Sequence, residues 1–354
     1  MKHTNKLPLV TTIKERCRVC YTCVRECPAK AIRIAEGQAE VISERCIGCG
    51  NCVRVCSQKA KKVLSGIEQV QHILSSDDKV AAIIAPSFPV EFAELEYQTF
   101  VGMVRVMGFA IVHEVAFGAD LVAREYRKLL TSNDDKRYIS TSCPAIIGFV
   151  EKYFPHLVTM LMPIVSPMVA DARALHRLHG DDLKIVFIGP CIAKKGEAAS
   201  GNISGEIDAV LTFSELRDMF DAKGIKATNG TPSEFDGPQA GLGAIFPVSR
   251  GLLQAAHIEE DLIVGDVVAT DGRSNFVEAI EEFGSGDFDA RLLEVLCCNG
   301  CIMGAGITSN FQLLTRRASV SNYVRKKMQT LDKEVWRRDI EKFSDLDLYH
   351  TFTA

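Results

Sequence analysis

The sequence has no long apolar run, little net charge and few aromatic residues. Its most hydrophobic stretch, residues 100–119, is interrupted by Arg105, His113 and Glu114, so no membrane span is expected. The segment Met1 to Lys14 lacks the apolar core of a signal peptide, which favours a cytoplasmic protein. Aromatic residues make up only 7% of the chain, and no basic stripe with interleaved aromatics predicts nucleic-acid binding.

The net charge of -4 conceals an uneven distribution. Residues 1–63 hold 13 Lys or Arg against 5 Asp or Glu, whereas the remainder holds 28 against 40. The basic segment either balances anionic metal clusters bound within it or offers a docking surface to an acidic redox partner. With 354 residues and 47% apolar content, the chain can bury the cores of two or three domains.

Cysteine is abundant, with 13 in the chain. In a cytoplasmic protein this number indicates metal or redox chemistry and not disulfides. Eight cysteines form two runs of the pattern C-x2-C-x2-C-x3-C, one starting at Cys17 and its repeat at Cys46. This is the spacing of bacterial ferredoxins with two 4Fe-4S cubanes, in which the fourth cysteine of each run serves the other cluster. The predicted cubane ligands are Cys17, Cys20, Cys23 and Cys56 for one cluster and Cys46, Cys49, Cys52 and Cys27 for the other.

From residue 79 onward, strands alternate with amphipathic helices, which predicts an α/β fold with parallel sheets covered by helices. The expected strands are 81–85, 110–115, 138–140, 184–188 and 208–212, and the expected helices are 90–107, 120–130, 145–153, 167–179 and 214–222. Residues 228–243 are expected as a long loop, and residues 319–342 have a charged, helical pattern. The expected domains are a small α+β ferredoxin-like domain (1–66), a connector (67–78), an α/β domain (79–318) and a helical segment with a tail (319–354).

The other five cysteines lie in three distant islands. They are Cys143, Cys191, and the group Cys297, Cys298 and Cys301. The expected strand 184–188 ends just before Cys191, and open parallel sheets place their sites beyond the carboxyl ends of strands. The islands therefore indicate one buried iron-sulfur site assembled from three loops.

As a set, these islands behind two ferredoxin-like runs resemble the iron-only (FeFe) hydrogenases over roughly residues 80–310. The resemblance implies a domain of two lobes that holds an H-cluster, which is a 4Fe-4S cubane bridged by Cys301 to a diiron unit with CO, cyanide and azadithiolate. The implied cubane ligands are Cys143, Cys191, Cys297 and Cys301, with Cys298 as the alternative to Cys297. The implied reaction is the reversible interconversion of dihydrogen with protons and electrons, which pass through the N-terminal clusters.

The resemblance extends to residues around the cofactor. Lys194 matches a lysine that hydrogen-bonds a cyanide ligand. Residues Ala85, Pro86 and Ser87 resemble the loop around the other cyanide, and Ser166 a further cofactor contact. Phe246 corresponds to the segment over the distal iron, or is an ordinary core aromatic. The implied partners are dihydrogen and protons, a ferredoxin-like or other redox protein, and the proteins that mature the cofactor.

At the positions of the proton pathway, several residues differ from those of productive hydrogenases of the family. Ser142 replaces a cysteine that relays protons, and a hydroxyl is far more basic than a thiol with its pKa of about 8.5. Met162 stands in place of a serine, whereas Glu197 aligns with the last acid of the pathway. The pattern therefore favours a slow enzyme with Ser142, Lys194 and Glu197 as catalytic residues. It is similar to the sensory branch of the family, with a signalling partner in another chain or beyond this sequence.

Two alternatives remain at this stage. One is a non-catalytic carrier or scaffold, similar to cytosolic iron-sulfur assembly proteins, that binds only cubanes. The other is an ordinary hydrogenase with an altered proton path. Infrared spectroscopy separates the first from a hydrogenase, since only a bound diiron unit gives CO and cyanide bands. A measurement of the turnover rate distinguishes the second alternative from a slow or sensory hydrogenase.

Overall fold

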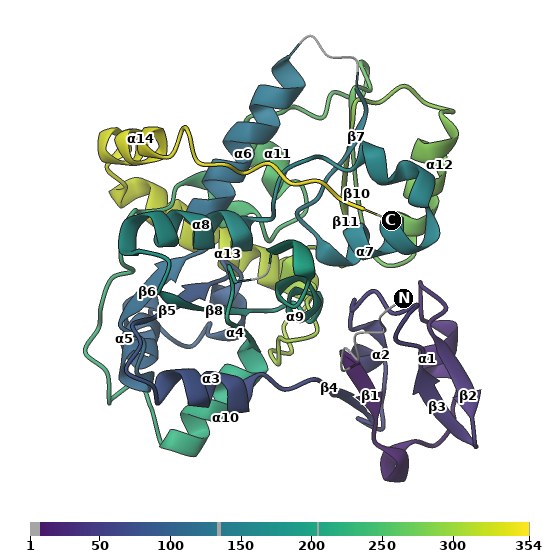
Figure 1. The fold of residues 1–354 in the computed structure, drawn as a ribbon, viewed down its shortest axis with the longest axis horizontal. Coiled ribbons are helices and arrows are strands. Elements are labelled where there is room, and N and C mark those ends of the chain that lie inside the picture. Colours follow the sequence, from purple (N-terminus) through teal and green to yellow (C-terminus); the bar gives the residue numbers. More distant parts are fainter. Residues whose placement is uncertain (1–7, 133–135, 204, 354) are drawn as a thin grey trace.

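A computed structural model describes residues 8–132, 136–203 and 205–353. The N-terminal segment, drawn in purple in Figure 1, contains two antiparallel strand pairs and two short helices. The pairs are β1 (Val10–Thr12) with β4 (Lys61–Val63) and β2 (Ile32–Ala35) with β3 (Gln38–Val41). The helices are α1 (Thr22–Arg25) and α2 (Asn51–Arg54). This is the small α+β fold that the two cysteine runs predict.

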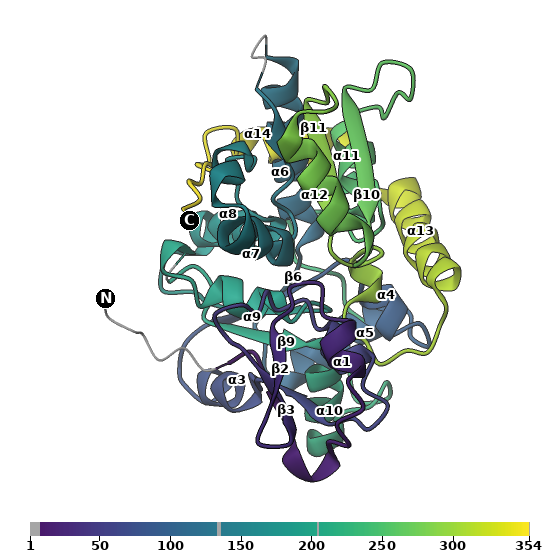
Figure 2. The same ribbon diagram turned by 90° about the vertical axis from the view of Figure 1, so that its right-hand side faces the viewer.

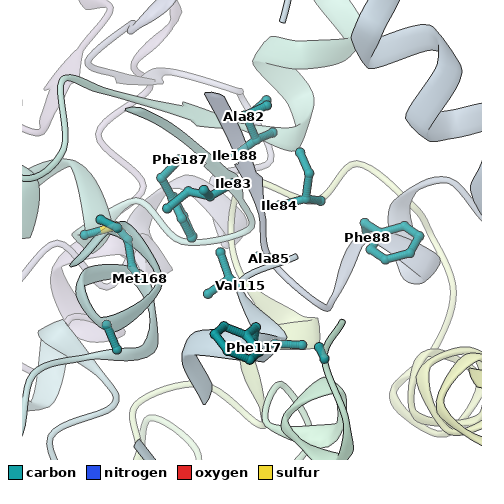
Figure 3. Packing of buried hydrophobic residues seen from close by; sticks show 14 of the residues in the cluster. Ala82, Ile83, Ile84, Ala85, Phe88, Val115, Phe117, Met168, Phe187 and Ile188 are labelled. Carbon is teal, nitrogen blue, oxygen red and sulfur yellow. The ribbon is translucent and has the colours of Figure 1, made fainter. Parts of the chain in front are cut away.

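A parallel sheet of four strands forms the core of the first lobe, in the order β6-β5-β8-β9. The strands are β5 (Val80–Ile84), β6 (Ile111–Glu114), β8 (Lys184–Gly189) and β9 (Ala209–Thr212). All five residues of β5 are buried, as expected for a central strand that is covered on both faces. Figure 3 shows Ile83 and Ile84 of this strand with Phe187 and Ile188 of β8 and, beyond the strand ends, Phe88 and Phe117.

A second, three-stranded parallel sheet forms the other lobe, in the order β10-β11-β7. Its strands are β7 (Tyr138–Ile139), β10 (Val267–Asp271) and β11 (Leu292–Leu296). Figure 2 shows α12 (Asn275–Ser285) lying along β10 and β11. Phe276 and Phe283 of this helix are fully buried, and burial of each contributes about 1.5–3 kcal/mol. These two phenylalanines belong to a core cluster that also includes the N-terminal segment, whereas Tyr138, Ala269 and Leu292 of the second sheet belong to the core of the first lobe.

The remaining helices cover the sheets and connect the lobes. They are α3 (Ile67–Leu74), α4 (Phe88–Glu91), α5 (Tyr97–Met107), α6 (Ala116–Thr131), α7 (Pro144–Tyr153), α8 (Pro167–His179), α9 (Ala193–Ala198), α10 (Phe213–Lys223), α11 (Gly251–Ala256), α13 (Leu313–Thr330) and α14 (Lys333–Lys342). Short 3-10 turns are η1 (Lys14–Arg16), η2 (Pro155–Met160), η3 (Gly201–Ile203), η4 (Leu242–Ile245) and η5 (Cys301–Met303). In the described residues, none of these helices is both long enough and apolar enough to span a membrane.

The expected strands 81–85, 110–115, 138–140, 184–188 and 208–212 are confirmed within one or two residues, as is the helical pattern over 319–342, whereas the single helix expected over 90–107 is wrong. The expected helix 90–107 is split into α4 and α5, because the Glu91 carboxylate turns inward and accepts hydrogen bonds from the amides of Thr308 and Ser309. The stretch 319–342 is also two helices, since Asp332 caps the start of α14 by accepting bonds from the amides of Glu334 and Val335. Strands β10 and β11 were not anticipated.

Candidate iron-sulfur and cofactor site

The internal duplication of the N-terminal segment is visible in the backbone. Three pairs of equivalent positions in the two cysteine runs share positive φ angles: Val19 and Gly48 (51° and 69°), Tyr21 and Gly50 (62° and 71°), Lys30 and Lys59 (46° and 48°). These left-handed turns give the two runs the same tight loop conformation. The amides of Ala31 and Ala60 donate to the sulfurs of Cys27 and Cys56, both at 3.3 Å. Equivalent positions therefore present equivalent donors to sulfur.

The eight N-terminal thiols fall into two electrostatic groups. Burial raises the pKa of Cys23, and the nearby charges of Cys56, Cys17 and Cys20 raise it further. Burial likewise raises the pKa of Cys52 to about 12, with further contributions from Cys49, Cys46 and Cys27. Each group thus takes three cysteines from one run and the fourth from the other, which is the exchange that the sequence pattern predicts.

Buried Lys61 lies near both groups, since its charge lowers the pKa of Cys23 and of Cys52. Its ammonium group donates to the Thr12 hydroxyl at 2.6 Å and to the Ala39 carbonyl at 3.1 Å. A buried cation held in this way compensates the negative charge of thiolate-bound cubanes. Lys61 therefore contributes to the excess of basic residues in this segment.

The three later cysteine islands converge because each follows the carboxyl end of a parallel strand. Cys143 follows β7 and begins α7, Cys191 follows β8, and Cys297 directly follows β11. The segment Ala85, Pro86 and Ser87 follows β5. Loops from both sheets therefore meet at one place, which is where open parallel sheets form their sites.

The thiols of this third group are mutual neighbours. The pKa of Cys301 is raised well above its usual value by burial and then by the charges of Cys143, Cys191 and Cys298. Burial raises the pKa of Cys191 to about 12, with contributions from Cys143 and Cys298. The pKa of Cys297, the fourth ligand expected from the sequence, is raised well above its usual value by its contact with Cys49 of the N-terminal segment, by burial, and by the charges of Cys298 and Cys143, so Cys297 lies near both groups. Cys297 also approaches Cys143 through its backbone amide.

In the described residues, no three His, Cys, Asp or Glu side chains lie close enough to hold a single metal ion. The fit of the site to an iron-sulfur cluster therefore rests on the grouping of the thiols. Each of the three groups gathers four thiols, the number that a cubane requires. A cubane is larger than a single metal ion, so it fits a group of sulfurs that lie too far apart to share one ion.

Lys194 reaches this third group from α9. Its charge lowers the pKa of Cys143, Cys191 and Cys301, although burial raises all three overall. The Lys194 side chain is buried, donates to the Ser166 hydroxyl at 2.8 Å and pairs with Glu197 at 2.7 Å. Three predicted site residues, Lys194, Ser166 and Glu197, therefore lie together.

Two serines near the strand ends lack a good hydrogen-bond partner among the described residues. The Ser87 side chain is fully buried, and its hydroxyl is unpaired there. The hydroxyl of Ser142 is also buried, beside the Tyr126 hydroxyl but without a hydrogen bond of good geometry in the described part of the chain. Buried polar groups are normally satisfied, so both positions fit a bound polar group.

The other two predicted cofactor contacts pack in or against the hydrophobic core. Ala85 is buried in the main core, and Phe246 is half-buried against the same core. Phe246 is nevertheless close to the third group in the chain fold, since the carbonyl of the next residue, Pro247, accepts a bond from Ile302 at 3.3 Å. A side chain at Gly300 would clash with that carbonyl, because a Cβ there would lie 2.7 Å from it.

The positions of the altered proton pathway do not form a continuous chain of polar groups. Met162 is fully buried. Glu197 lines a cavity of about 310 Å³ that also borders Ser166 and His350, and this cavity connects it to the surface between α7 and α9.

Two further charged residues lie near the site. Arg273 donates to the Cys298 sulfur at 3.5 Å, while its Nε has no partner among the described residues. Glu294, on β11, is buried, and burial raises its pKa to about 8. Arg273 gave no signal, because it follows β10, a strand that the sequence did not reveal.

The N-terminal segment is fixed against the second lobe by polar contacts. The Tyr153 hydroxyl donates to the carbonyls of Ala29 and Arg45 at 2.6 and 2.9 Å, and Lys152 donates to the Cys46 carbonyl at 2.8 Å. Gly50 packs so closely that a Cβ would lie 2.6 Å from that of Ala305. These contacts hold the second N-terminal thiol group against the loops of the third.

Comparison with protein families gives two matches. Residues 78–305 match the family described as iron only hydrogenase large subunit, C-terminal domain. Residues 9–57 match the 4Fe-4S dicluster domain. The first match covers more than half of the chain, and the second covers both N-terminal cysteine runs.

Two curated relatives are similar in sequence. Iron hydrogenase 1 of Clostridium pasteurianum is 26% identical over 300 residues, covering 68% of this chain and 52% of the relative. A cytosolic Fe-S cluster assembly factor of Yarrowia lipolytica is 22% identical over 168 residues, covering 43% of this chain and 34% of the relative. The chain thus spans about half the length of the first relative and about a third of the second.

Two solved structures share the fold. An FeFe hydrogenase from Chlamydomonas reinhardtii superposes with a TM-score of 0.67 at 18% identity, covering 82% of this chain and 99% of that one. An FeFe hydrogenase studied for oxygen inactivation of its H cluster gives a TM-score of 0.64 at 20% identity, covering 82% and 96%. At these identities the likeness establishes the fold.

Proposed function

Because this chain belongs to the iron-only hydrogenase family, we propose that it reacts reversibly with dihydrogen at a diiron unit attached through Cys301 to a buried cubane. The observation that carries the proposal is the gathering of thiols from three distant loops beside a buried lysine. Cys143, Cys191 and Cys301 are mutual neighbours, and Lys194 lies within electrostatic reach of all three. A buried ammonium at this position suits an anionic cofactor.

The residues fit the cofactors that the family implies. The two N-terminal groups would each hold a 4Fe-4S cubane, and the third group would hold the cubane of an H-cluster. Lys194 and the unpaired hydroxyl of Ser87 would hydrogen-bond the polar ligands of the diiron unit, with Ala85, Pro86, Ser166 and Phe246 around them. When bound, such a unit supplies an open metal position and a base for hydrogen chemistry.

The protein's own residues partly bury the cofactor site, place charges beside it and connect it to the dicluster segment. Cys143 is buried, and Cys191 and Cys301 are partly buried, so each charge near these thiols acts more strongly than it would in water. Contacts of Tyr153 and Lys152 hold the dicluster segment against the second lobe, and cubanes held by its two thiol groups would supply the route for electrons. We assign residues 1–66 to this electron-transfer domain, 67–78 to a connector, 79–318 to the cofactor domain and 319–354 to a C-terminal segment.

We further propose that turnover is slow and that the protein has a sensory role. Ser142 is a poor proton relay, Met162 is apolar and fully buried, and Glu197 is engaged by Lys194 at 2.7 Å. Glu197 nevertheless borders the surface cavity, so it would act as the last proton carrier. The implied partners are a ferredoxin-like or other redox protein, cofactor maturation proteins and a signalling partner, all in the cytoplasm.

Infrared spectroscopy of the matured protein tests the proposal. CO and cyanide stretches should be present and should shift under dihydrogen. In Lys194→Met the cyanide stretches should move or the diiron unit should be lost, because the cationic donor is gone. The matched control is Lys326→Met, which removes a lysine whose side chain is 75% exposed, and it should leave the spectrum unchanged. A loaded protein whose bands do not respond to dihydrogen would refute the hydrogen chemistry.

A second candidate is a carrier or scaffold that binds only cubanes. The similarity to the Yarrowia lipolytica assembly factor favours it. The buried Lys194 with its Ser166 and Glu197 partners weighs against it, because a cubane alone does not require a buried donor of this kind. The carrier predicts three cubanes and no CO or cyanide bands after maturation, an outcome that the same infrared experiment detects.

A further inference from the structure

Helix α14 is held on the protein by few contacts. None of its residues is buried, and Figure 1 shows it beside α6. Asp120 and Arg124, one turn apart on α6, both reach the C-terminal segment. The Arg124 guanidinium donates to the carbonyls of Ile340 and Phe343 at 2.8 and 2.9 Å. The Asp120 carboxylate accepts a bond from the indole nitrogen of Trp336 at 3.2 Å. Release of α14 would therefore expose little apolar surface.

The carboxylate of Asp120 also organises the backbone around η4. Asp120 is 6% exposed, and it accepts bonds from the amides of Gly241 and Gly243 at 2.5 and 2.6 Å. The Trp336 ring lies against Gly241, since a Cβ there would lie 2.8 Å from the indole nitrogen. At Gly243 a Cβ would lie 2.1 Å from the Ala116 carbonyl, so η4 packs directly on α6. One buried carboxylate therefore joins α14 to η4 through three hydrogen bonds.

The segment around η4 in turn contacts the loop that carries Cys301. The carbonyl of Pro247, two residues beyond η4, accepts a bond from the amide of Ile302 at 3.3 Å. The carbonyl of Ile302 accepts a bond from the buried guanidinium of Arg316 in α13 at 2.8 Å. Both backbone polar groups of the residue after Cys301 are thus held, one through η4 and one directly from α13. The two C-terminal helices reach this loop by two routes.

We propose that Asp120 and Trp336 are positioning residues that couple the docking of α14 to the segment 241–247 and, through it, to the loop that carries Cys301. The proposal rests on the proposed function, because it places these residues behind the same cofactor site. Coupling requires an element with two arrangements, and α14, docked or released, is that element. Because coupling between sites is reciprocal, a change at the loop also biases the docking of α14. Helix α14 is therefore the exposed end of a chain of contacts that begins beside the buried thiols.

Hydrogen–deuterium exchange of the protein reconstituted with cubanes tests the coupling without the diiron unit. Trp336→Phe keeps an aromatic ring but removes the indole donor. Exchange in peptides covering 241–247 and 300–303 should become at least about tenfold faster, the effect of losing one hydrogen bond to a charged group. Asp120→Asn should accelerate the same peptides, because an amide side chain accepts bonds at only one oxygen.

Arg337→Ala is the matched control for Trp336→Phe. Arg337 is the next residue of α14, and its side chain is 64% exposed and pairs only with Glu334 among the described residues. The control should leave exchange in both peptides unchanged. It separates the contact made by the indole from a general loosening of the helix.

Infrared spectroscopy of the matured protein gives a second readout. The CO and cyanide bands should shift in Trp336→Phe, because the segment beside the site is no longer held in place, and should stay unchanged in Arg337→Ala. If the parent protein shows no such bands, the proposed function fails, whereas the exchange measurements still decide the coupling.

Four results would overturn the proposal. Unchanged exchange over 241–247 in Trp336→Phe would remove Trp336 as a positioning residue. Faster exchange there, with unchanged exchange over 300–303, would show that the coupling ends before Cys301. An equal acceleration in Arg337→Ala would assign the effect to loosening of α14 as a whole. Bands that are present in the parent and identical in Trp336→Phe would show that the coupling does not reach the cofactor site.

Discussion

Replacing Lys195 by methionine should destabilise the protein strongly, because Lys195 is the counter-ion of a buried carboxylate. Its ammonium group donates to Glu215 at 3.0 Å and to the Val210 carbonyl at 2.9 Å. The side chains of Lys195 and Glu215 are 5% and 11% exposed. Glu215 also accepts bonds from the amides of Gly66 and Thr212 at 2.8 and 2.6 Å. This network ties Gly66, the residue before α3, to α9 and α10, and Lys194 is the neighbouring residue of Lys195 in α9.

The expected magnitude follows from what the substitution leaves behind. Breaking a buried ion pair by removing one partner costs about 3–5 kcal/mol, since the other charge stays buried. Glu215 retains three donors, from the amides of Gly66 and Thr212 and the Thr212 hydroxyl, so we expect a loss of about 3 kcal/mol. Adding Glu215→Gln to Lys195→Met should cost at least about 1 kcal/mol less than the sum of the two single changes, because it removes the unpaired charge.

The pH dependence gives a second check. Burial alone would raise the pKa of Glu215, but Lys195 and the Thr212 amide hold it below its usual value. A lowered pKa in the folded state stabilises the protein above the unfolded value of about 4.3, and this contribution is lost as the pH falls. Lys195→Met removes much of it, so the difference between variant and parent should shrink at acid pH.

Denaturant unfolding at neutral and acid pH measures these differences, with exposed Lys326→Met as the control. A loss below about 1 kcal/mol at neutral pH would mean that the pair behaves like a surface ion pair. Strict additivity of Lys195→Met and Glu215→Gln would likewise contradict the proposed coupling. Either result would refute the account of this network as a charged anchor between the connector and α9.

Three further changes test other parts of the molecule. Ser142→Cys should raise the rate of hydrogen turnover by no more than about 10²-fold, because Met162 still interrupts the proton path. This is the lower end of the rate effect of general acid-base catalysis. An unchanged rate would show that residue 142 does not limit turnover. Glu294 has its pKa raised to about 8 by burial, so it lowers stability progressively as the pH rises from about 4.5 to 8. Glu294→Gln should therefore be relatively more stable than the parent at pH 8.5 than at pH 5, and equal differences in thermal midpoint would contradict this. Tyr153→Phe loses hydrogen bonds to Ala29 and Arg45, so it should make the dicluster segment more susceptible to proteolysis; unchanged cleavage rates would argue against a docking role.

Much of the architecture could be predicted because it depends on local patterns. The strands before Ser87 and Cys191 are short apolar runs that are buried on both faces, and such runs are recognisable without knowledge of their neighbours. The helix break after Glu91 could not be predicted, because it depends on partners from residue 217 and residues 308–309, which are distant in the chain. Strand β10 was missed since it lies at a sheet edge and is only partly buried, which weakens its apolar signal.

The sequence by itself determined the two N-terminal cysteine groups and the convergence of the three islands. The exchange of the fourth cysteine follows from fixed short spacings that are repeated in the second run, and the chain has few ways to fold such loops. Only the tertiary structure decided which side chains surround these thiols. Arg273 donates to the Cys298 sulfur at 3.5 Å, and the Tyr153 hydroxyl donates to the Ala29 carbonyl at 2.6 Å. The partners are 25 and 124 residues apart in the chain, so these contacts depend on how the strands and lobes pack, and no local pattern predicts them.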